Sequence, residues 1–344
     1  MIHIEIPFLN DSALAARVQR RIDLKTKPLG ALGRLEQLAL QIALVQGVDA
    51  PTLRLPQLLV FAADHGLAAQ GVSAYPAEVT AQMVLNMLGG GAAVAVLARQ
   101  HGIALTVVDC GVRSDFAPQP GLVIAKVAAG SADSACGPAM TAAQCAQALE
   151  QGAALLRSRP GNVLLLGEMG IGNTSAAALL MARLTQAPLH ECVGRGTGLD
   201  DAGLAHKTAV LGRVLALHAA ASGPLEALAA FGGLEIATMT GAILEAARER
   251  RLVVVDGFIS TAAVAVAAAL APAVLQRCVF AHCSAESGHA RWLRSLGVQA
   301  LLDFGLRLGE GSGAALAWPL ICSAQRLLEQ MASFESAGVS QRAP

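Results

Sequence analysis

Aromatic residues make up only 3% of this sequence, neither sign of charge is in excess, and no two cysteines form a Cys-x-x-Cys pair. Lysine plus arginine equals aspartate plus glutamate at 25 each, so no overall field favours nucleic acid or an anionic membrane. Seven scattered cysteines indicate neither a disulfide framework nor a zinc knuckle. The first residues lack the basic start and apolar core of a signal peptide. We therefore expect a cytoplasmic protein without nucleic-acid partners.

A membrane span is also not expected. The longest uncharged stretch, residues 257–276, has the length of a span, but it is mostly alanine and contains Ser260, Thr261 and Pro272. A short apolar run of strand type, ending at Asp256, precedes it. We therefore interpret the stretch as a buried helix of a soluble protein, packed closely against a sheet.

Six short apolar runs, each ending in a polar residue or glycine, organise the middle of the chain. They are LLVFAADHG from Leu58, LTVVDCGV from Leu105, VLLLGEMG from Val163, LVVVDGF from Leu252, CVFAHCS from Cys278 and ALLDFGL from Ala300. Helical segments rich in alanine and leucine separate them, a pattern typical of parallel strands with right-handed crossovers. The sequence predicts an α/β fold with an open, mainly parallel, six-stranded Rossmann-like sheet.

In such a sheet the carboxyl ends of the strands share one edge, where ligands bind. The polar residues at the ends of the six runs are therefore expected near a common rim. They include Asp64, His65, Asp109, Cys110, Glu168, Asp256, His282, Asp303 and Glu310. We expect two or three of them to take part in chemistry and the others to cap helices or complete turns.

Both ends of the chain have helical character and no strand pattern. Leu35, Leu38, Ile42 and Val45 recur at helical spacing, and a second helix is predicted from Ala314 onward, interrupted at Pro319. We therefore predict a small helical domain made of residues 1–50 and 314–344. Residues 51–313 would form a large α/β domain that carries the active site.

The most informative segment is NVLLLGEMGIGNTSAAALLM, residues 162–181, in which a buried strand enters a glycine-rich turn that opens a helix. Gly170 and Gly172 permit a tight turn, and Asn173 or Thr174 is expected to cap the helix. Free N–H groups at such a turn favour phosphate or carboxylate. The segment lacks the Gly-Lys-Ser/Thr ending of a nucleotide loop and the dinucleotide fingerprint. An ordinary turn explains the glycines equally well; the carboxylate of Glu168 favours a functional site.

Two further glycine-rich turns follow. The first, GRGTGLDDAGLAHK at residues 194–207, is either a second phosphate grip or a plain loop capped by Asp200 or Asp201. The candidate phosphate contacts are Gly196, Thr197, Gly198 and Lys207. The second turn, GEGSGAALA at residues 309–317, places glycines on both sides of Glu310 and opens a helix. Glycine neighbours leave this carboxylate accessible to a ligand, and nearby N–H groups help to keep it ionised. A purely structural turn is the alternative.

Across nearly its whole length the chain resembles the nicotinate-nucleotide:dimethylbenzimidazole phosphoribosyltransferases of cobalamin lower-ligand assembly. The matching stretches are KTKPLGALGRLE, FAADHGLAAQGVSAYPAEVTAQMV, VVDCGV, GEMGIGNTS, GRGTG, FGGLEIATMTGAIL, VVDGFISTAA and LGEGSGAAL. The resemblance implies phosphoribosyl transfer from nicotinate mononucleotide to dimethylbenzimidazole by a homodimer with a large α/β and a small helical domain. It assigns the catalytic base to Glu310, a second glutamate to Glu168, and the acceptor pocket to a segment that includes Ser73, Tyr75 and Gln82.

The residues themselves are consistent with this chemistry. Nicotinate bonded to ribose is a cationic leaving group, so its displacement needs neither a metal nor an acid, and we expect no cofactor. Attack on the opposite face of the sugar would invert the anomeric carbon, and a carboxylate would remove the benzimidazole proton. His65, or His282 with Cys283 and His289, lacks the spacing that would fix a metal.

Two other classes of protein stay open at this point. A nucleotide-linked oxidoreductase would need a Gly-x-Gly-x-x-Gly turn after the first strand, where the sequence has Asp64, His65 and Gly66 instead. A nucleotide sensor without catalytic activity would keep the phosphate turns but would have no use for the bare carboxylate of Glu310.

Overall fold

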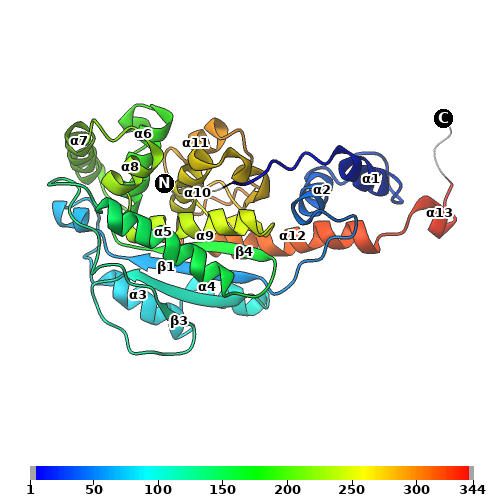
Figure 1. Ribbon diagram of the computed structural model, residues 1–344, viewed down its shortest axis with the longest axis horizontal. Helices are drawn as coiled ribbons and strands as arrows, with labels where there is room; N and C mark the ends of the chain where they lie inside the picture. Colours follow the sequence, from blue (N-terminus) through cyan, green and yellow to red (C-terminus); the bar gives the residue numbers. More distant parts are fainter. Residues whose placement is uncertain (1–4, 341–344) are drawn as a thin grey trace.

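The computed structural model describes residues 5–340. Its centre is one six-stranded sheet with the strand order β3-β2-β1-β4-β5-β6, and every neighbouring pair is parallel (Figure 1). The strands are β1 (Gln57–Ala63), β2 (Ala104–Gly111), β3 (Leu122–Ile124), β4 (Val163–Met169), β5 (Leu252–Val255) and β6 (Cys278–Phe280). This order reverses direction between β1 and β4, as in doubly wound folds. The predicted fold class is confirmed.

One of the six predicted strands was wrong. The run that begins at Ala300 forms no strand and contributes only an isolated bridge between Leu302 and His282. The sixth strand is instead β3, which pairs with β2 at the edge of the sheet. Sequence reasoning missed β3 because it has only three residues, Leu122, Val123 and Ile124, in a long polar connection.

Helices cover both faces of the sheet. Those between the strands and at the chain ends are α1 (Ser12–Asp23), α2 (Arg34–Gln46), α3 (Val79–Leu88), α4 (Ala93–Gln100), α5 (Ala142–Arg157), α6 (Asn173–Thr185), α7 (Asp201–Leu217), α8 (Pro224–Phe231), α9 (Leu234–Arg248), α10 (Phe258–Leu270), α11 (His289–Ser295), α12 (Ser312–Gln330) and α13 (Phe334–Ala337). Short 3-10 turns occupy Gly66–Gln70, Leu189–Glu191 and Pro272–Arg277.

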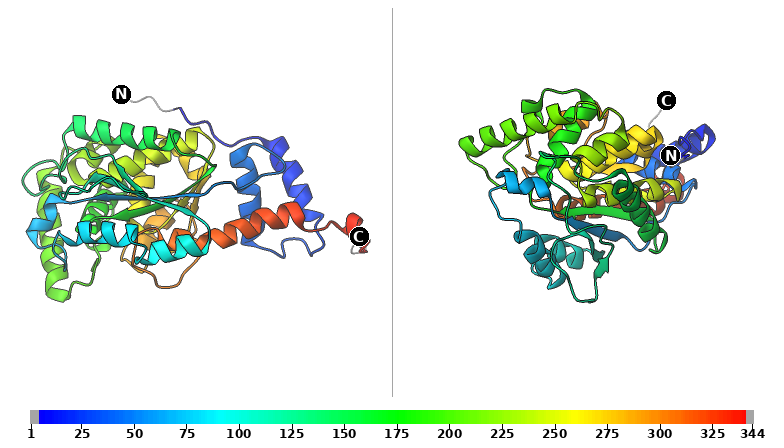
Figure 2. Two further views of the ribbon diagram at one scale, coloured as in Figure 1. Left: turned by 90° about the horizontal axis from the view of Figure 1, so that it is seen from below. Right: turned by 60° about the vertical axis from the view of Figure 1, so that its left-hand side comes forward.

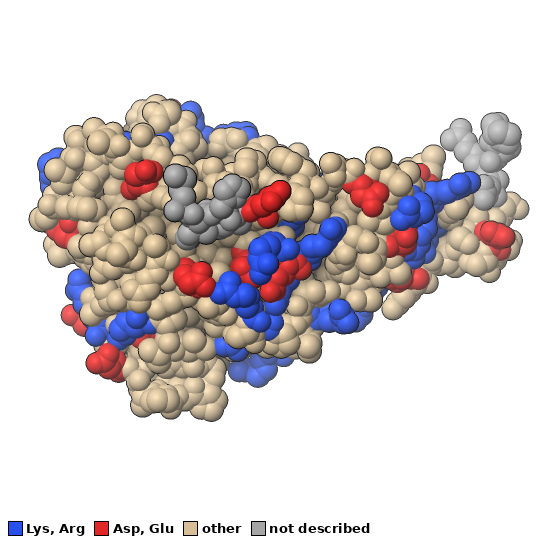
Figure 3. All heavy atoms as spheres, in the orientation of Figure 1, with Lys and Arg blue, Asp and Glu red and all other residues tan. Residues whose placement is uncertain are grey.

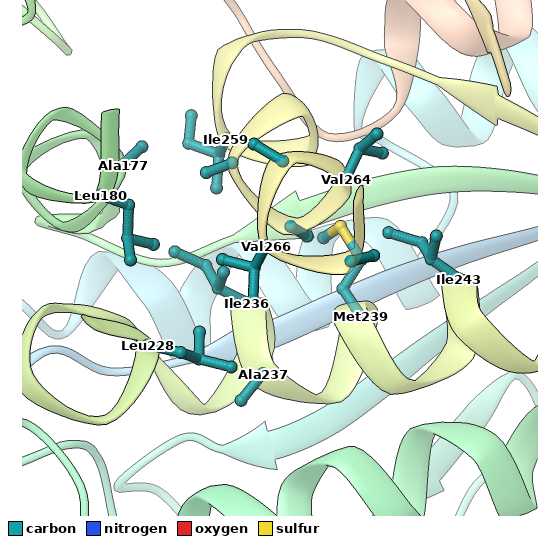
Figure 4. Close-up of a cluster of buried hydrophobic side chains, with 14 of the residues drawn as sticks. Ala177, Leu180, Leu228, Ile236, Ala237, Met239, Ile243, Ile259, Val264 and Val266 are labelled. Carbon is teal, nitrogen blue, oxygen red and sulfur yellow. The ribbon is translucent and has the colours of Figure 1, made fainter. Parts of the chain in front are cut away.

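Alternate residues of each strand face two separate hydrophobic cores. Leu59 and Phe61 of β1 belong to the core shared with α5, α6, α8, α9 and α10, whereas Leu58 and Val60 face α1, α2, α3, α4 and α12. Figure 4 shows part of the first core, where Leu180 of α6 and Leu228 of α8 approach the side chains of α9 and α10. Burial on both faces explains why these strands are almost continuously apolar.

The helices nearest the two ends of the chain, α1, α2 and α12, lie together beside the sheet. The left panel of Figure 2 shows α12 running from the sheet to α1 and α2, and α12 packs against α2 and α4. The predicted interruption at Pro319 was wrong, because α12 continues through this proline and keeps its apolar face buried on either side of it. The division into a small domain of residues 1–50 and 314–344 and a large domain of residues 51–313 stays a prediction; residues 1–4 and 341–344 lie outside the described structure.

The stretch predicted as a buried helix of a soluble protein contains α10, whose residues are almost all buried. A different stretch, Val79–Gln100, is apolar and long enough to span a membrane by length and composition. It consists of two helices, α3 with 10 residues and α4 with 8. Each is shorter than the roughly 20 residues that a spanning helix requires. On the face drawn in Figure 3, acidic and basic side chains are interspersed.

Candidate active site

A cavity of about 350 Å³ opens at the carboxyl ends of β4, β5 and β6 and is closed on one side by the segment that follows β1. It lies where doubly wound sheets bind their ligands. The lining residues that carry polar or charged side chains are Tyr75, Glu168, Asn173, Thr174, Thr197, His282, Ser284, Glu286, Arg307 and Glu310. A larger and more open hollow lies beside α2, but none of the glycine-rich turns reaches it.

The turn after β4 is built around Glu168. Gly172, with φ of 98°, is the N-cap of α6, and no side chain caps this helix. The predicted capping by Asn173 or Thr174 was therefore wrong. The Asn173 amide donates to a carboxylate oxygen of Glu168, and the Thr174 hydroxyl accepts a hydrogen bond from Lys207. Both side chains serve the site rather than the helix end.

Glu168 is enclosed by protein. Burial raises the pKa of its carboxyl to about 8, the negative charge of Asp256 acts in the same direction, and the hydrogen bond from Asn173 opposes them. One oxygen of Glu168 accepts the backbone N–H of Glu310 at 3.4 Å. The side chain also approaches Gly309 so closely that a Cβ there would lie 2.1 Å from its oxygen. Glu168 therefore supports the turn that carries Glu310.

Glu310 stands in an uncommon backbone conformation. Gly309, Glu310 and Gly311 all have positive φ, at 80°, 67° and 93°. The carboxyl group is buried next to the first turn of α4 and lines the cavity. Burial raises its pKa; the backbone N–H of Val94 opposes this rise, and the charge of Asp256 adds to it. One carboxylate oxygen, Oε2, is buried and has no hydrogen-bond partner among the described residues.

The second feature of the site is a buried cation, Lys207, next to two of the glycine-rich turns. Lys207 of α7 is completely buried, and its Nζ donates to the Thr174 hydroxyl at 2.9 Å and to the Gly194 carbonyl at 3.2 Å. Burial lowers the pKa of Lys207 to about 8, while the charge of Glu286 opposes this shift. The α7 helix is capped by Asp200, one of the two capping residues considered from the sequence. A buried ammonium group beside glycine-rich turns is suited to an anion.

Only some of the other residues predicted to contact the substrates line the cavity. Gly170, Thr197 and Gly196 line the cavity; Gly172, Gly198 and Lys207 do not. Ser73 lies just outside, with its hydroxyl 3.4 Å from that of Thr197. Tyr75 lines the cavity mouth, whereas Gln82 is exposed and lies outside the lining. The apolar lining residues include Val79 and Met83 of α3 and Phe258 and Ile259 of α10.

Several predicted rim residues do not reach the cavity. His65 is buried and its Nε2 lies 2.6 Å from a Glu235 carboxylate oxygen; burial opposes the charged imidazole, but Glu235 outweighs it and raises the pKa of His65. Asp109 and Cys110 are also buried, and burial raises the pKa of both. Asp303 is exposed. Within residues 5–340, no three His, Cys, Asp or Glu side chains are grouped as a metal site requires.

Sequence reasoning missed two charged residues of the cavity, Glu286 and Arg307. Glu286 lies in the turn between β6 and α11. The N–H of Ser284 in this turn donates to Nδ1 of His289 at 2.8 Å, and burial lowers the pKa of His289 to about 3. Arg307 donates to the Gly196 carbonyl at 3.2 Å from a segment that has no periodicity and so gave no signal.

The fold and the site together define a doubly wound α/β protein in which a buried lysine and glycine-rich turns lie near two buried glutamates. A family model described as a phosphoribosyltransferase, DBI_PRT, matches residues 8–339. The chain belongs to this phosphoribosyltransferase family. This membership counts against both the oxidoreductase and the sensor without catalytic activity that the sequence left open.

Full-length relatives agree with the family assignment. A protein of Variovorax paradoxus (strain S110) named nicotinate-nucleotide--dimethylbenzimidazole phosphoribosyltransferase is 66% identical over 334 residues, which cover 97% of this chain and 96% of that protein. A protein of the same name from Cupriavidus necator is 59% identical over 337 residues and 97% of both chains. The crystal structure of CobT from Thermus thermophilus superposes with a TM-score of 0.93 at 44% identity, covering 96% of this chain and 100% of that one.

Proposed function

We propose that this protein transfers the phosphoribosyl group of nicotinate mononucleotide to dimethylbenzimidazole, forming α-ribazole phosphate and nicotinate, with Glu310 as general base. The reaction itself follows from the family and from relatives that carry the name of this activity at 66% and 59% identity. The observation that supports the mechanism is the placement of Glu310. Its carboxyl group lines the same cavity as Thr174, which accepts a hydrogen bond from the buried Lys207, and one carboxylate oxygen of Glu310 has no partner among the described residues.

The donor is assigned to the side of the cavity near α6 and α7. Its phosphate would accept hydrogen bonds from Thr174, Thr197 and the backbone at Gly196, with the buried charge of Lys207 directly behind them. Gly170, Gly172, Asn173 and Gly198 would shape these turns. Charge-assisted hydrogen bonds of this kind fix a phosphate strongly. They would leave the anomeric carbon of the ribose facing the centre of the cavity.

The acceptor is assigned to the opposite wall, where Tyr75, Val79 and Met83 offer a mainly apolar surface for a flat ring. Ser73 and Gln82 would lie at its margin. A benzimidazole that attacks through one nitrogen must lose the proton on the other, and Glu310 would accept it. Because the acceptor and the leaving nicotinate stand on opposite faces of the sugar, the β configuration becomes α. Positioning the two reactants in line supplies much of the rate.

Glu168 has a different role in this proposal. Its carboxyl holds the N–H of Glu310, and burial raises its pKa to about 8, so it is largely protonated in the ligand-free protein at neutral pH. The cationic pyridinium of the donor would favour its ionised form when bound. Glu168 would thus support the base and respond to the charge of the donor.

The protein is also proposed to be a cytoplasmic homodimer. Large apolar side chains are exposed on α3, on α4 and in the segment before Glu310: Leu85, Val96, Phe304 and Leu308. Exposed apolar surface of this kind is typical of protein interfaces. A second copy of the chain would cover it. The mechanism draws only on side chains of the protein and requires no cofactor.

The direct test is to mix purified protein with nicotinate mononucleotide and dimethylbenzimidazole and to measure both products. We expect nicotinate release that depends on the acceptor, with an equal amount of the riboside phosphate in the α configuration by NMR. Nicotinate release without dimethylbenzimidazole would identify a hydrolase instead. A β-configured product would contradict the in-line geometry, although it would leave the transfer itself intact.

A further inference from the structure

The conformation of Glu310 has to be maintained by its surroundings. Glu310, with φ of 67°, lies in the left-handed region, which is unfavourable for a residue that carries a side chain, and its two glycine neighbours also have positive φ. Such conformations persist only where the surrounding structure fixes them. Glu168 accounts for one contact, to the N–H of Glu310 itself. The remaining contacts come from the opposite side of the turn.

Asp256 makes these contacts. It follows β5 directly and is almost completely buried. One carboxylate oxygen accepts the N–H of Gly311 at 3.2 Å, and the other accepts the N–H of Ala314 at 2.9 Å. The α12 helix begins here with Gly311 as its N-cap and has no capping side chain of its own. A carboxylate from another strand therefore caps this helix and holds the residue that follows Glu310.

The packing around Asp256 leaves little room for change. A Cβ on Gly313 would lie 2.9 Å from an Asp256 oxygen and 2.1 Å from the ring of His282. The His282 Nε2 is 3.8 Å from the same Asp256 oxygen, and His282 itself lines the cavity. The glycine thus allows the first turn of α12 to approach both side chains closely. Glu310 is tied to β4 through Glu168 and to β5 through Asp256.

We propose that Asp256 is a positioning residue for the general base, which fixes the backbone of Glu310 and, through its negative charge, keeps the Glu310 carboxyl ready to accept a proton. This inference rests on the proposed role of Glu310. Asp256 lies behind the turn, where it meets the backbone rather than the cavity. Its effect on the reaction therefore passes through Glu310.

The electrostatic part of the inference concerns how strongly Glu310 binds a proton. Burial raises the pKa of Glu310 and the charge of Asp256 raises it further, while the Val94 N–H at the start of α4 lowers it. Burial also raises the pKa of Asp256, whereas His282 and the N–H groups of Ala314 and Gly311 favour its charged form. Glu168, at the end of β4, and His282, after β6, are the other ionisable groups that face this turn. A stronger base is a better proton acceptor from benzimidazole. Removing the Asp256 charge should make Glu310 a weaker base.

The test is a double-mutant cycle with Asp256→Asn, Glu310→Gln and the combined variant, measured as kcat and as kcat/KM against pH. Asparagine keeps the shape of Asp256 but loses its charge and one of its two acceptors. We expect Asp256→Asn to lower kcat about tenfold or more, because small misplacements of a reacting group are costly. The fall in kcat/KM on the acidic side of the pH profile, the acidic limb, should occur at a lower pH than in the wild type. In the Glu310→Gln background the same change should have almost no effect.

Two further variants separate positioning from charge. Asp256→Ser removes the charge and keeps one short acceptor, so its acidic limb should move like that of Asp256→Asn even if the asparagine variant folds poorly. Asp303→Asn removes an exposed charge from the segment that leads to Glu310 and should leave both kcat and the limb unchanged. Thermal unfolding confirms that each variant is folded.

Three outcomes are decisive. An unmoved acidic limb in both Asp256 variants would overturn the inference and leave Asp256 as a structural cap of α12. If Asp256→Asn lowers kcat by the same factor in the wild-type and in the Glu310→Gln background, the inference about Asp256 is also overturned. Slow turnover by Glu310→Gln would in that case still support Glu310 as the general base. Full activity of Glu310→Gln would instead overturn the proposed mechanism itself.

Discussion

The backbone N–H of Glu310 donates to the carboxylate of Glu168, and this contact makes the two glutamates of the cavity unequal. Glu168 holds the turn from the end of β4, whereas Glu310 presents an oxygen with no partner among the described residues. Both carboxyl groups are buried, but only Glu310 is free to accept a proton from a ligand without losing a contact within the protein. Their difference is the basis of the first prediction.

Glu310→Gln should reduce kcat by on the order of a hundredfold or more, the usual size of a general-base effect, because the amide cannot accept the acceptor's proton. The KM values of both substrates should change far less. Steady-state kinetics with saturating dimethylbenzimidazole measures this directly. Protonation of the free acceptor has to be titrated separately so that it is not mistaken for the enzyme's acidic limb.

The matched control is Glu168→Gln, which changes the other glutamate of the same rim. It keeps an oxygen that accepts the Glu310 N–H, so we expect a smaller fall in kcat than in Glu310→Gln. Near wild-type turnover by Glu310→Gln together with an inactive Glu168→Gln would mean that the base is Glu168.

Glu168 should also make the stability of the ligand-free protein depend on pH. Its pKa is raised from an ordinary value near 4.5 to about 8, so between these pH values the folded state keeps a proton that the unfolded state releases. The contribution of this group is complete below pH 4.5 and is lost as the pH rises through about 8.

We therefore expect Glu168→Gln, which does not titrate, to gain stability relative to wild type as the pH rises from 5 to 8, by on the order of a few kcal/mol. Urea unfolding of both proteins at several pH values gives the two free energies of unfolding. A constant difference between them at all pH values would show that Glu168 does not carry the proton.

Lys207→Met should raise the KM for nicotinate mononucleotide about tenfold or more, with little change in the KM for dimethylbenzimidazole, because the methionine fills the buried space without its charge. Nicotinate riboside, which lacks the phosphate, provides the control. Wild type should strongly prefer the mononucleotide, and the variant should discriminate much less between the two donors. Undiminished discrimination would place the phosphate elsewhere.

Gly167→Ala should displace the turn that carries Glu310. A Cβ on this β4 glycine would lie 2.3 Å from the carbonyl oxygen of Glu310, so the turn must shift. We expect kcat to fall roughly ten- to a hundredfold and stability to fall by about 1–3 kcal/mol. Gly137→Ala is the control, since nothing lies within 4 Å of its added Cβ. Wild-type kinetics in Gly167→Ala would mean that the position of Glu310 is not critical.

The proposed homodimer predicts a dimer mass by light scattering at micromolar concentration. Leu85→Lys and Val96→Glu place charges at apolar positions that are 52% and 45% exposed, and should shift the protein toward monomer. Leu217→Lys, at a position 54% exposed at the end of α7, serves as the control and should remain dimeric. A monomeric wild type would contradict the dimer.

Much of the fold was predictable because periodicity is a local property. The apolar runs of β1, β2, β4, β5 and β6 are long enough to recognise, and their separation by helices implies parallel pairing. The run at Ala300 and the strand β3 were interpreted wrongly for one reason. A short apolar segment becomes a strand only if a neighbouring strand offers free hydrogen-bonding groups, and β2 offers them to β3.

The glycine-rich turns that carry Glu168 and Glu310 were visible in the sequence because their residue types are themselves the signal. Lys207 could also be assigned to a helix, since the turn before it ends in a capping aspartate. What these residues touch was not visible. Asn173 was expected to cap α6 but bonds Glu168, and His65 was placed on the rim but pairs with Glu235 in the interior.

The amino acids alone thus determined the class of fold and the family, and they predicted the carboxylate that we propose as the base, because each depends on patterns within short segments. Only the tertiary structure decided which oxygen of which glutamate stays free. That choice depends on Asp256 and Glu168, which lie 54 and 142 residues before Glu310 and reach its turn from β5 and β4. Parallel strands bring such distant positions to one edge, and the contacts made there cannot be inferred from spacing along the chain.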